Sequence, residues 1–66
     1  MSALDAHWAE VHAREELESA GREYARRMAD PDDDGAGMGA LAARVHDLEE
    51  AHVEAVRARY AAEAGA

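Results

Sequence analysis

The chain has 66 residues and no Cys, so it forms at most one small domain without disulfides or thiolate metal sites. Its 15 acidic side chains outnumber seven Arg, and the net charge of −8 argues against binding to nucleic acids or anionic membranes. Ala dominates, Pro occurs once, and no apolar run approaches the ~20 residues of a membrane span, so we expect an all-α cytoplasmic protein.

The first predicted helix covers residues 3–29. Ser2 is a good N-cap, and Asp5 stands where a capping box places an acid. One apolar stripe on this helix comprises Ala3, Ala6, Glu10, Ala13, Leu17, Ala20, Tyr24 and Met28. A second comprises Leu4, Trp8, Val11, Glu15, Glu18 and Ala25. Because each stripe must be covered, this helix is expected to pack against two partners.

An acidic, Gly-rich turn is predicted over residues 30–39, because Pro31 keeps the preceding residue out of the α region. The turn opens with the D-x-D-x-D-G spacing of a calcium-binding EF-hand loop, at Asp30, Asp32, Asp34 and Gly35. The twelfth position of such a loop carries a bidentate Glu, and here it is Leu41. A degenerate EF-hand is therefore the weaker alternative, and we do not expect calcium as a cofactor.

The second predicted helix covers residues 39–63, with an apolar stripe at Leu41, Val45, Leu48, Val56 and Tyr60. Glu49 and His52 fall on the same stripe, one turn apart. A carboxylate and an imidazole in an apolar seam cost free energy unless something satisfies them. Glu-x-x-His is also the unit that di-iron helical bundles combine with a lone Glu from a facing helix.

The two helices predict an antiparallel hairpin that makes residues 1–66 a single domain. A two-helix hairpin has no enclosed core, and a chain of this length hides only about 60% of its unfolded surface. We therefore expect a homodimer that forms a four-helix bundle. With the turn near Asp34, positions whose numbers sum to about 69 lie level. Three carboxylates then face Glu49 and His52, namely Glu15, Glu16 and Glu18.

These residues also resemble a known family, the encapsulated ferritins, over residues 15–60. The resemblance rests on Glu15-Glu16-Leu17-Glu18, the nearby aromatic Tyr24, a turn, and Asp47-Leu48-Glu49-Glu50-Ala51-His52. It implies that two hairpins form a ferritin-like four-helix bundle with a di-iron centre at their interface, and that dimers assemble into a ring. The implied activity is that of a ferroxidase, which oxidises Fe(II) to Fe(III) for iron storage.

The resemblance also implies which residues act. Glu16, Glu49 and His52 would be the catalytic residues and iron ligands, and Glu15 and Glu18 would guide metal towards the centre. The implied partners are a second copy of the chain and an encapsulin shell, which would enclose the protein within the cytoplasm.

Two departures from the family are visible. The family's Trp-Tyr pair falls on Arg22 and Glu23, with Tyr24 one position late, and the loop is longer. A further C-terminal helix and a shell-targeting peptide of that family have no counterpart among the 66 residues.

Two interpretations of the carboxylates and His52 remain open. Carboxylate and imidazole ligands suit Fe, and also Mn or Zn. The alternative is a non-enzymatic helical oligomerisation or adaptor module, in which polar seam residues set the register and the Glu cluster is a solvated face. The remaining histidines are expected at the surface: His7, His12 and His46. A second interpretation of His46, three residues before Glu49, is a further ligand on the same helix.

Overall fold

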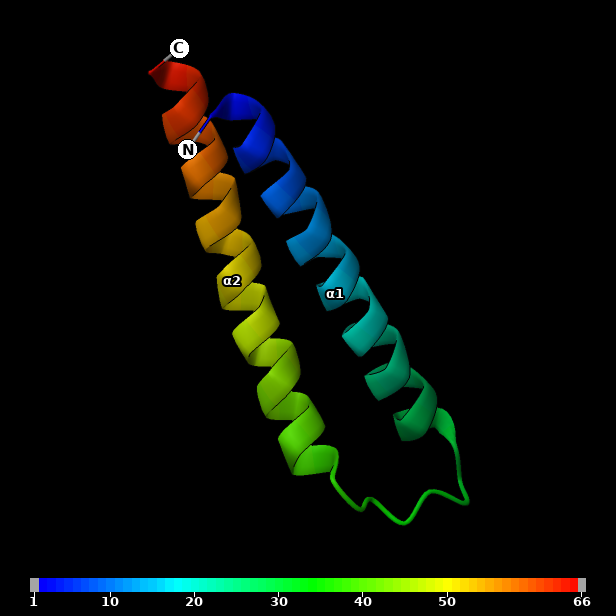
Figure 1. Ribbon diagram of the computed structural model, residues 1–66. Helices are drawn as coiled ribbons and strands as arrows, with labels where there is room; N and C mark the ends of the chain where they lie inside the picture. The colour runs from blue at the N-terminus through cyan, green and yellow to red at the C-terminus, as the bar shows by residue number, and fades with distance from the viewer. Residues whose placement is uncertain (1, 66) are drawn as a thin grey trace.

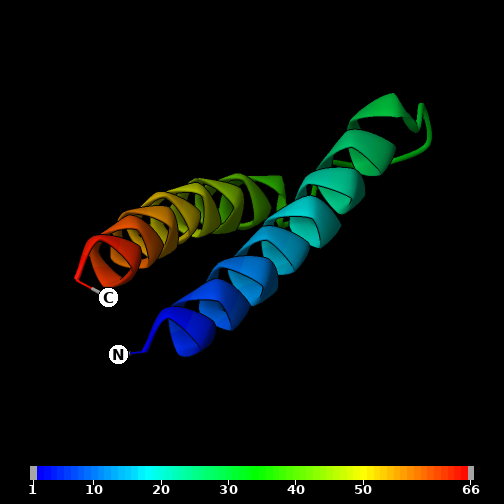
Figure 2. The same ribbon diagram turned by 90° about the horizontal axis from the view of Figure 1, so that it is seen from above.

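The computed structural model describes residues 2–65 as two long antiparallel helices joined by one loop (Figures 1 and 2). Helix α1 spans Ala3–Ala29 and helix α2 spans Met38–Ala64. The hairpin is 51 Å long and 14 by 12 Å across, and the start of α1 lies beside the end of α2. The predicted all-α hairpin is confirmed, although the loop ends at Gly37, two residues earlier than expected.

Local sequence signals explain both ends of α1. The Ser2 hydroxyl oxygen accepts a hydrogen bond from the backbone N–H of Asp5 at 3.1 Å, as expected for an N-cap. Arg26 and Arg27 occupy the last turn, where positive charge is favourable next to the helix C-terminus. Asp30 then takes an extended conformation, with φ −84° and ψ 113°, because Pro31 follows it.

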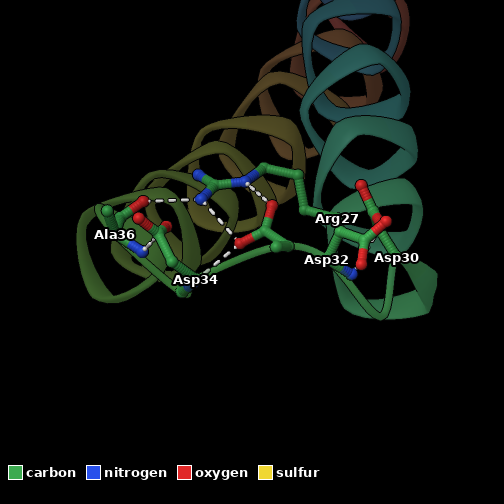
Figure 3. Close-up of polar contacts among 7 residues, drawn as sticks. Arg27, Asp30, Asp32, Asp34 and Ala36 are labelled. Carbon is green, nitrogen blue, oxygen red and sulfur yellow. Dashed lines mark hydrogen bonds and ion pairs between the residues drawn. The ribbon is translucent and has the colours of Figure 1, made fainter.

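Arg27 closes the loop from the end of α1 (Figure 3). Its Nε and Nη2 atoms donate to the two carboxylate oxygens of Asp33 at 2.8 and 3.0 Å. Nη2 also donates to the carbonyl oxygen of Ala36 at 2.6 Å. Gly35 and Gly37 have φ values of 79° and 75°, which only Gly adopts readily. The loop is thus a compact turn held by one guanidinium group.

The loop carboxylates are engaged within the loop itself. Asp30, Asp33 and Asp34 each accept a hydrogen bond from the backbone N–H two residues further on. Leu41, at the position where an EF-hand would carry its bidentate Glu, is half-buried on α2. Arg27 binds Asp33, which stands between the ligand positions Asp32 and Asp34 of the calcium motif and is not one of them.

The pKa of Asp33 provides a test of this loop. It is lowered from 3.8 to about 2, first by the hydrogen bonds from Arg27 and then by the backbone N–H of Gly35. Because the folded pKa is depressed, the ionised carboxylate stabilises the hairpin above about pH 4, and this stabilisation is lost as the pH falls through 2. We expect Arg27→Gln to raise the Asp33 pKa towards 3.8, as measured by carboxyl-carbon NMR titration. The matched variant Arg26→Gln should leave it near 2, and equal shifts in the two variants would contradict the bidentate contact.

The interface between the helices is narrow and rich in Ala. Among residues 2–65, only Ala6 and Ala20 are buried, at 1% and 7% exposure. Half-buried residues of α1 towards α2 include Glu10, Ala13, Leu17, Tyr24 and Arg27, and those of α2 include Leu41, Val45, Leu48, His52, Val56 and Arg59. Met28 was predicted in this seam but is 64% exposed. Arg27 is half-buried instead, with its side chain directed to the loop.

A half-buried ion pair fixes the register of the hairpin. Arg59 Nε lies 2.7 Å from Glu10 Oε2, and the two side chains are only 25% and 12% exposed. The N–H is not aligned for a hydrogen bond, so the contact is primarily one of charge. The pair obeys the register expected from the sequence. The Arg59 guanidinium also lies 4.8 Å from the centre of the Tyr60 ring.

Removing one member of this pair should destabilise the fold. We expect Arg59→Leu to lower the free energy of unfolding by about 1–3 kcal/mol, because Glu10 then keeps a poorly hydrated charge without its partner. Adding Glu10→Leu should restore most of that loss. Urea unfolding followed by circular dichroism measures both effects. The exposed Arg22→Leu serves as the control, and an equal loss there would show that Glu10 and Arg59 are not coupled.

Candidate functional site

The structure places the predicted site residues midway along the hairpin. Glu49 and His52 lie one turn apart on α2, and the three acidic residues of α1 lie at the facing level. His52 is half-buried in the seam. Its Nε2 atom is enclosed by protein and has no hydrogen-bond partner among the described residues. All four carboxylates are exposed, namely Glu15, Glu16, Glu18 and Glu49.

Glu49 thus lies at the rim of the seam, although its spacing in the sequence predicted a position on the apolar stripe. The seam is narrow, since only the small Ala6 and Ala20 of α1 are buried among the described residues. Glu49 falls just outside it, whereas Val45, Leu48 and His52 stay within it.

Two shallow hollows border the seam and separate Glu16 from Glu49. One is lined by Glu15, Glu16, Ser19, Ala20, Glu23 and Arg44. The other is lined by Tyr24, Ala42, Val45, His46 and Glu49, and it shares no residue with the first. We name these the Glu16 edge and the Glu49 edge.

Helix geometry explains this separation. Arg44 and Glu49 are five residues apart, which places them about 140° apart around α2 with the seam residue Val45 between them. They therefore lie on opposite edges. Since Glu16 shares its hollow with Arg44, it lies across the seam from Glu49 within one chain.

A single hairpin does not assemble the predicted metal site. Within residues 2–65, no three Asp, Glu or His side chains come close enough together to hold a metal ion. The ligand types still fit iron, since carboxylate oxygens and an imidazole nitrogen suit it, and the unpartnered His52 Nε2 is a donor atom without a present role. Any site containing Glu49 and His52 needs ligands from a second chain or a changed side-chain arrangement.

The other histidines have ordinary surface surroundings. His46 Nε2 lies 3.0 Å from Glu50 Oε1, and both side chains are 68% exposed. The rings of His7 and His12 are exposed and lie against Trp8, with centroid distances of 5.5 and 6.4 Å.

Two structural contacts were not recognised in the sequence. The sequence placed Glu10 in a predicted seam and gave it no partner. The rule that positions whose numbers sum to about 69 lie level would have paired Glu10 with Arg59. The Arg27 contact has a weaker signal, an Arg in the last turn of a helix followed by a run of Asp.

The structure contains no apolar stretch suited to crossing a membrane in either of its two described helices. Comparison with known proteins gives no match, whether with protein-family models, curated proteins or solved structures. The geometry of the hairpin and the chemistry of its residues therefore carry the functional argument.

Proposed function

We propose that the chain is one half of a ferritin-like iron-oxidising protein, in which two hairpins form a four-helix bundle and share a di-iron site. Glu49 and His52 of each copy supply the Glu-x-x-His unit, and a carboxylate of α1 supplies the remaining ligand. Glu16, which the family resemblance indicates, and Glu18 are the two candidates for that role.

The observation that carries this proposal is the enclosed Nε2 atom of His52, which has no hydrogen-bond partner among the described residues. A buried imidazole nitrogen without a partner destabilises a protein by about 1–3 kcal/mol unless it has another role. Glu49 lies one turn before it on the same helix, and residues three apart on a helix can hold one ion together.

The low burial and the exposed apolar side chains of the hairpin favour pairing with a second copy. Only two residues of the described chain are buried, so a single hairpin has too little apolar burial to be stable alone. Five large apolar side chains are instead substantially exposed, and they are Leu4, Trp8, Met28, Val53 and Tyr60.

The proposed chemistry treats Fe(II) as the substrate. Two Fe(II) ions each give one electron to dioxygen, which takes up two protons and leaves as hydrogen peroxide. The chain's own contribution is to hold the two ions together with carboxylates that offset their growing positive charge. The exposed Glu15 and the net charge of −8 raise the local concentration of cations. Enclosure in an encapsulin shell stays a prediction from the family resemblance.

The test combines mass and iron chemistry on the purified chain. Light scattering should give a mass of at least two chains. Fe(II) added without oxygen should bind with two ions per dimer, and admitted air should then form Fe(III) faster than in buffer alone. A protein that leaves the rate at the buffer value contradicts the proposal.

A second function is favoured by one observation. The half-buried Glu10–Arg59 pair is the kind of polar seam contact that sets register in oligomerisation modules. A stable dimer that binds no metal would assign the chain to that adaptor class.

A further inference from the structure

A stripe of exposed side chains runs along α2 beside the Glu49 edge, in the yellow and orange part of the helix in Figure 1. We name it the Val53 stripe, and it comprises His46, Glu50, Val53, Arg57 and Tyr60. Val53 and Tyr60 are 47% and 60% exposed, and the side chains of His46 and Glu50 are each 68% exposed. All members except Tyr60 line one shallow hollow of α2. The stripe is therefore an uncovered helix face that carries both apolar and charged groups.

The charged residues of the Val53 stripe stand at nearly matching distances on the two sides of Val53. Glu50 comes three residues before Val53 and Arg57 four residues after it. Both diverge from Val53 in the same direction around the helix, by about 60° and 40°. His46 and Tyr60 stand seven residues before and after Val53, each within about 20° of it. The stripe is thus complementary in charge to a copy of itself that runs in the opposite direction.

A twofold axis at Val53, perpendicular to α2, would bring the stripe against such a copy. The axis reverses the direction of the helix but keeps each residue on the same side of the stripe. Glu50 then faces the partner's Arg57 on one side, with an offset of one residue, or about 1.5 Å, along the helices. The symmetry repeats this contact, so one interface contains two ion pairs with Val53 between them.

Neither charged group has a partner that would prevent this contact. Among residues 2–65, Arg57 forms no ion pair, whereas Arg27 and Arg59 each bind a carboxylate of their own hairpin. Glu50 contacts His46 through Oε1 at 3.0 Å, which leaves its Oε2 for another donor. Since the stripe itself supplies both the acid and the base, a second copy of the chain provides the matching partner for each.

We infer that two copies pair through their Val53 stripes, with the two α2 helices antiparallel and Glu50 of each copy bound to the partner's Arg57. This inference rests on the dimer of the proposed function but needs no metal, and it names the surface through which the copies meet. Val53 and Tyr60 supply the apolar contact, and the two ion pairs fix the register. Glu49 diverges from Val53 in the other direction around α2 and takes no part in these pairs.

Charge reversal on the two members of the pair tests this arrangement. In Arg57→Glu each Glu50 faces a second carboxylate, and in Glu50→Arg each Arg57 faces a second guanidinium group. Mixed in equal amounts, the two variants form a heterodimer in which both contacts join opposite charges again. A pair within one chain, such as Arg57 with Glu54 one turn before it, is not restored by mixing. Sedimentation in the presence of a chelator measures the dimer dissociation constant, and circular dichroism measures the helical content.

We expect each single variant to raise the dissociation constant at least about tenfold, because like charges then meet twice in the dimer. The mixture should return to within about threefold of the parent. Arg44→Glu is the matched control, since it makes the same charge change at an exposed position nine residues before Val53, on the opposite side of α2. It should also stay within about threefold of the parent, because it lies outside the proposed interface.

The inference and the proposed function have separate readouts. A mixture that associates no more tightly than its two components, or a parent that stays monomeric, overturns the inference. Fe(II) oxidation by the parent, measured on its own, judges the proposed function. A dimer that responds to the charge changes but does not oxidise Fe(II) contradicts the proposed function and leaves the inference standing. An iron-oxidising dimer that ignores the charge changes has the opposite meaning.

Discussion

Val53→Asp is expected to convert the proposed dimer into a poorly folded monomer. Val53 is 47% exposed and lies one turn after Glu49, and the two side chains line the same hollow of α2. In the proposed dimer, a new carboxylate there would be desolvated in the interface and repeated in the second copy, next to acidic residues that already repel each other. A loss of about 3 kcal/mol in association raises the dimer dissociation constant about a hundredfold. Because a single hairpin buries so little, its helical content should fall as well.

Sedimentation and circular dichroism at several protein concentrations measure this effect. Ala58→Asp is the matched control, since it adds the same charge five residues further along α2, at an exposed position about 140° around the helix. It should leave association nearly unchanged. A Val53→Asp protein that stays dimeric at the parent's dissociation constant shows that the surface of α2 around Val53 is not the interface.

His52→Leu is expected to separate metal binding from stability. Leu fills the seam position with apolar atoms and removes the buried Nε2, which has no partner among residues 2–65. The metal-free protein should therefore be as stable as the parent or more stable by about 1 kcal/mol. Fe(II) affinity should fall by more than about a hundredfold, beyond the usual effect of losing an outer-shell contact. Fe(III) formation should then drop to the rate in buffer.

Two variants control this prediction. His12→Ala removes an exposed imidazole that lies against Trp8 and lines neither hollow at Glu49, and should leave Fe(II) oxidation unchanged. Glu49→Gln removes the other half of the Glu-x-x-His unit and should match the iron defect of His52→Leu. Fe(II) oxidation at the parent rate by His52→Leu would place the site elsewhere and favour the adaptor function.

The fold was largely predictable because it depends on local signals. Ser2 caps α1, Pro31 prevents its extension, and long Ala-rich stretches between such signals favour helix. The register followed from the length of the turn, and the Glu10–Arg59 contact obeys it. Hydrophobicity predicted Met28 in the seam, but Arg27 lies there instead. Arg27 is half-buried because its guanidinium group binds Asp33 and Ala36 in the loop.

The sequence predicted which residues form the candidate site and how far along the hairpin they lie. It did not predict the edge of the seam on which each of them lies. The apolar spacing of the second helix identified His52 as a seam residue, and its half-buried ring and enclosed Nε2 agree with this. The same spacing did not reveal that Glu49 lies at a rim or that Glu16 lies on the other edge.

Periodicity determined which residues share a helix face and which lie level, since both depend only on spacing along one helix and on the length of the turn. It determined two helices, their antiparallel pairing, and an acidic cluster midway along them. Only the tertiary structure decided which of the two predicted stripes of α1 packs against the second helix. That choice sets Glu18 on the side of Glu49 and Glu16 opposite, because residues two apart on a helix diverge by about 200° and one packed partner separates them.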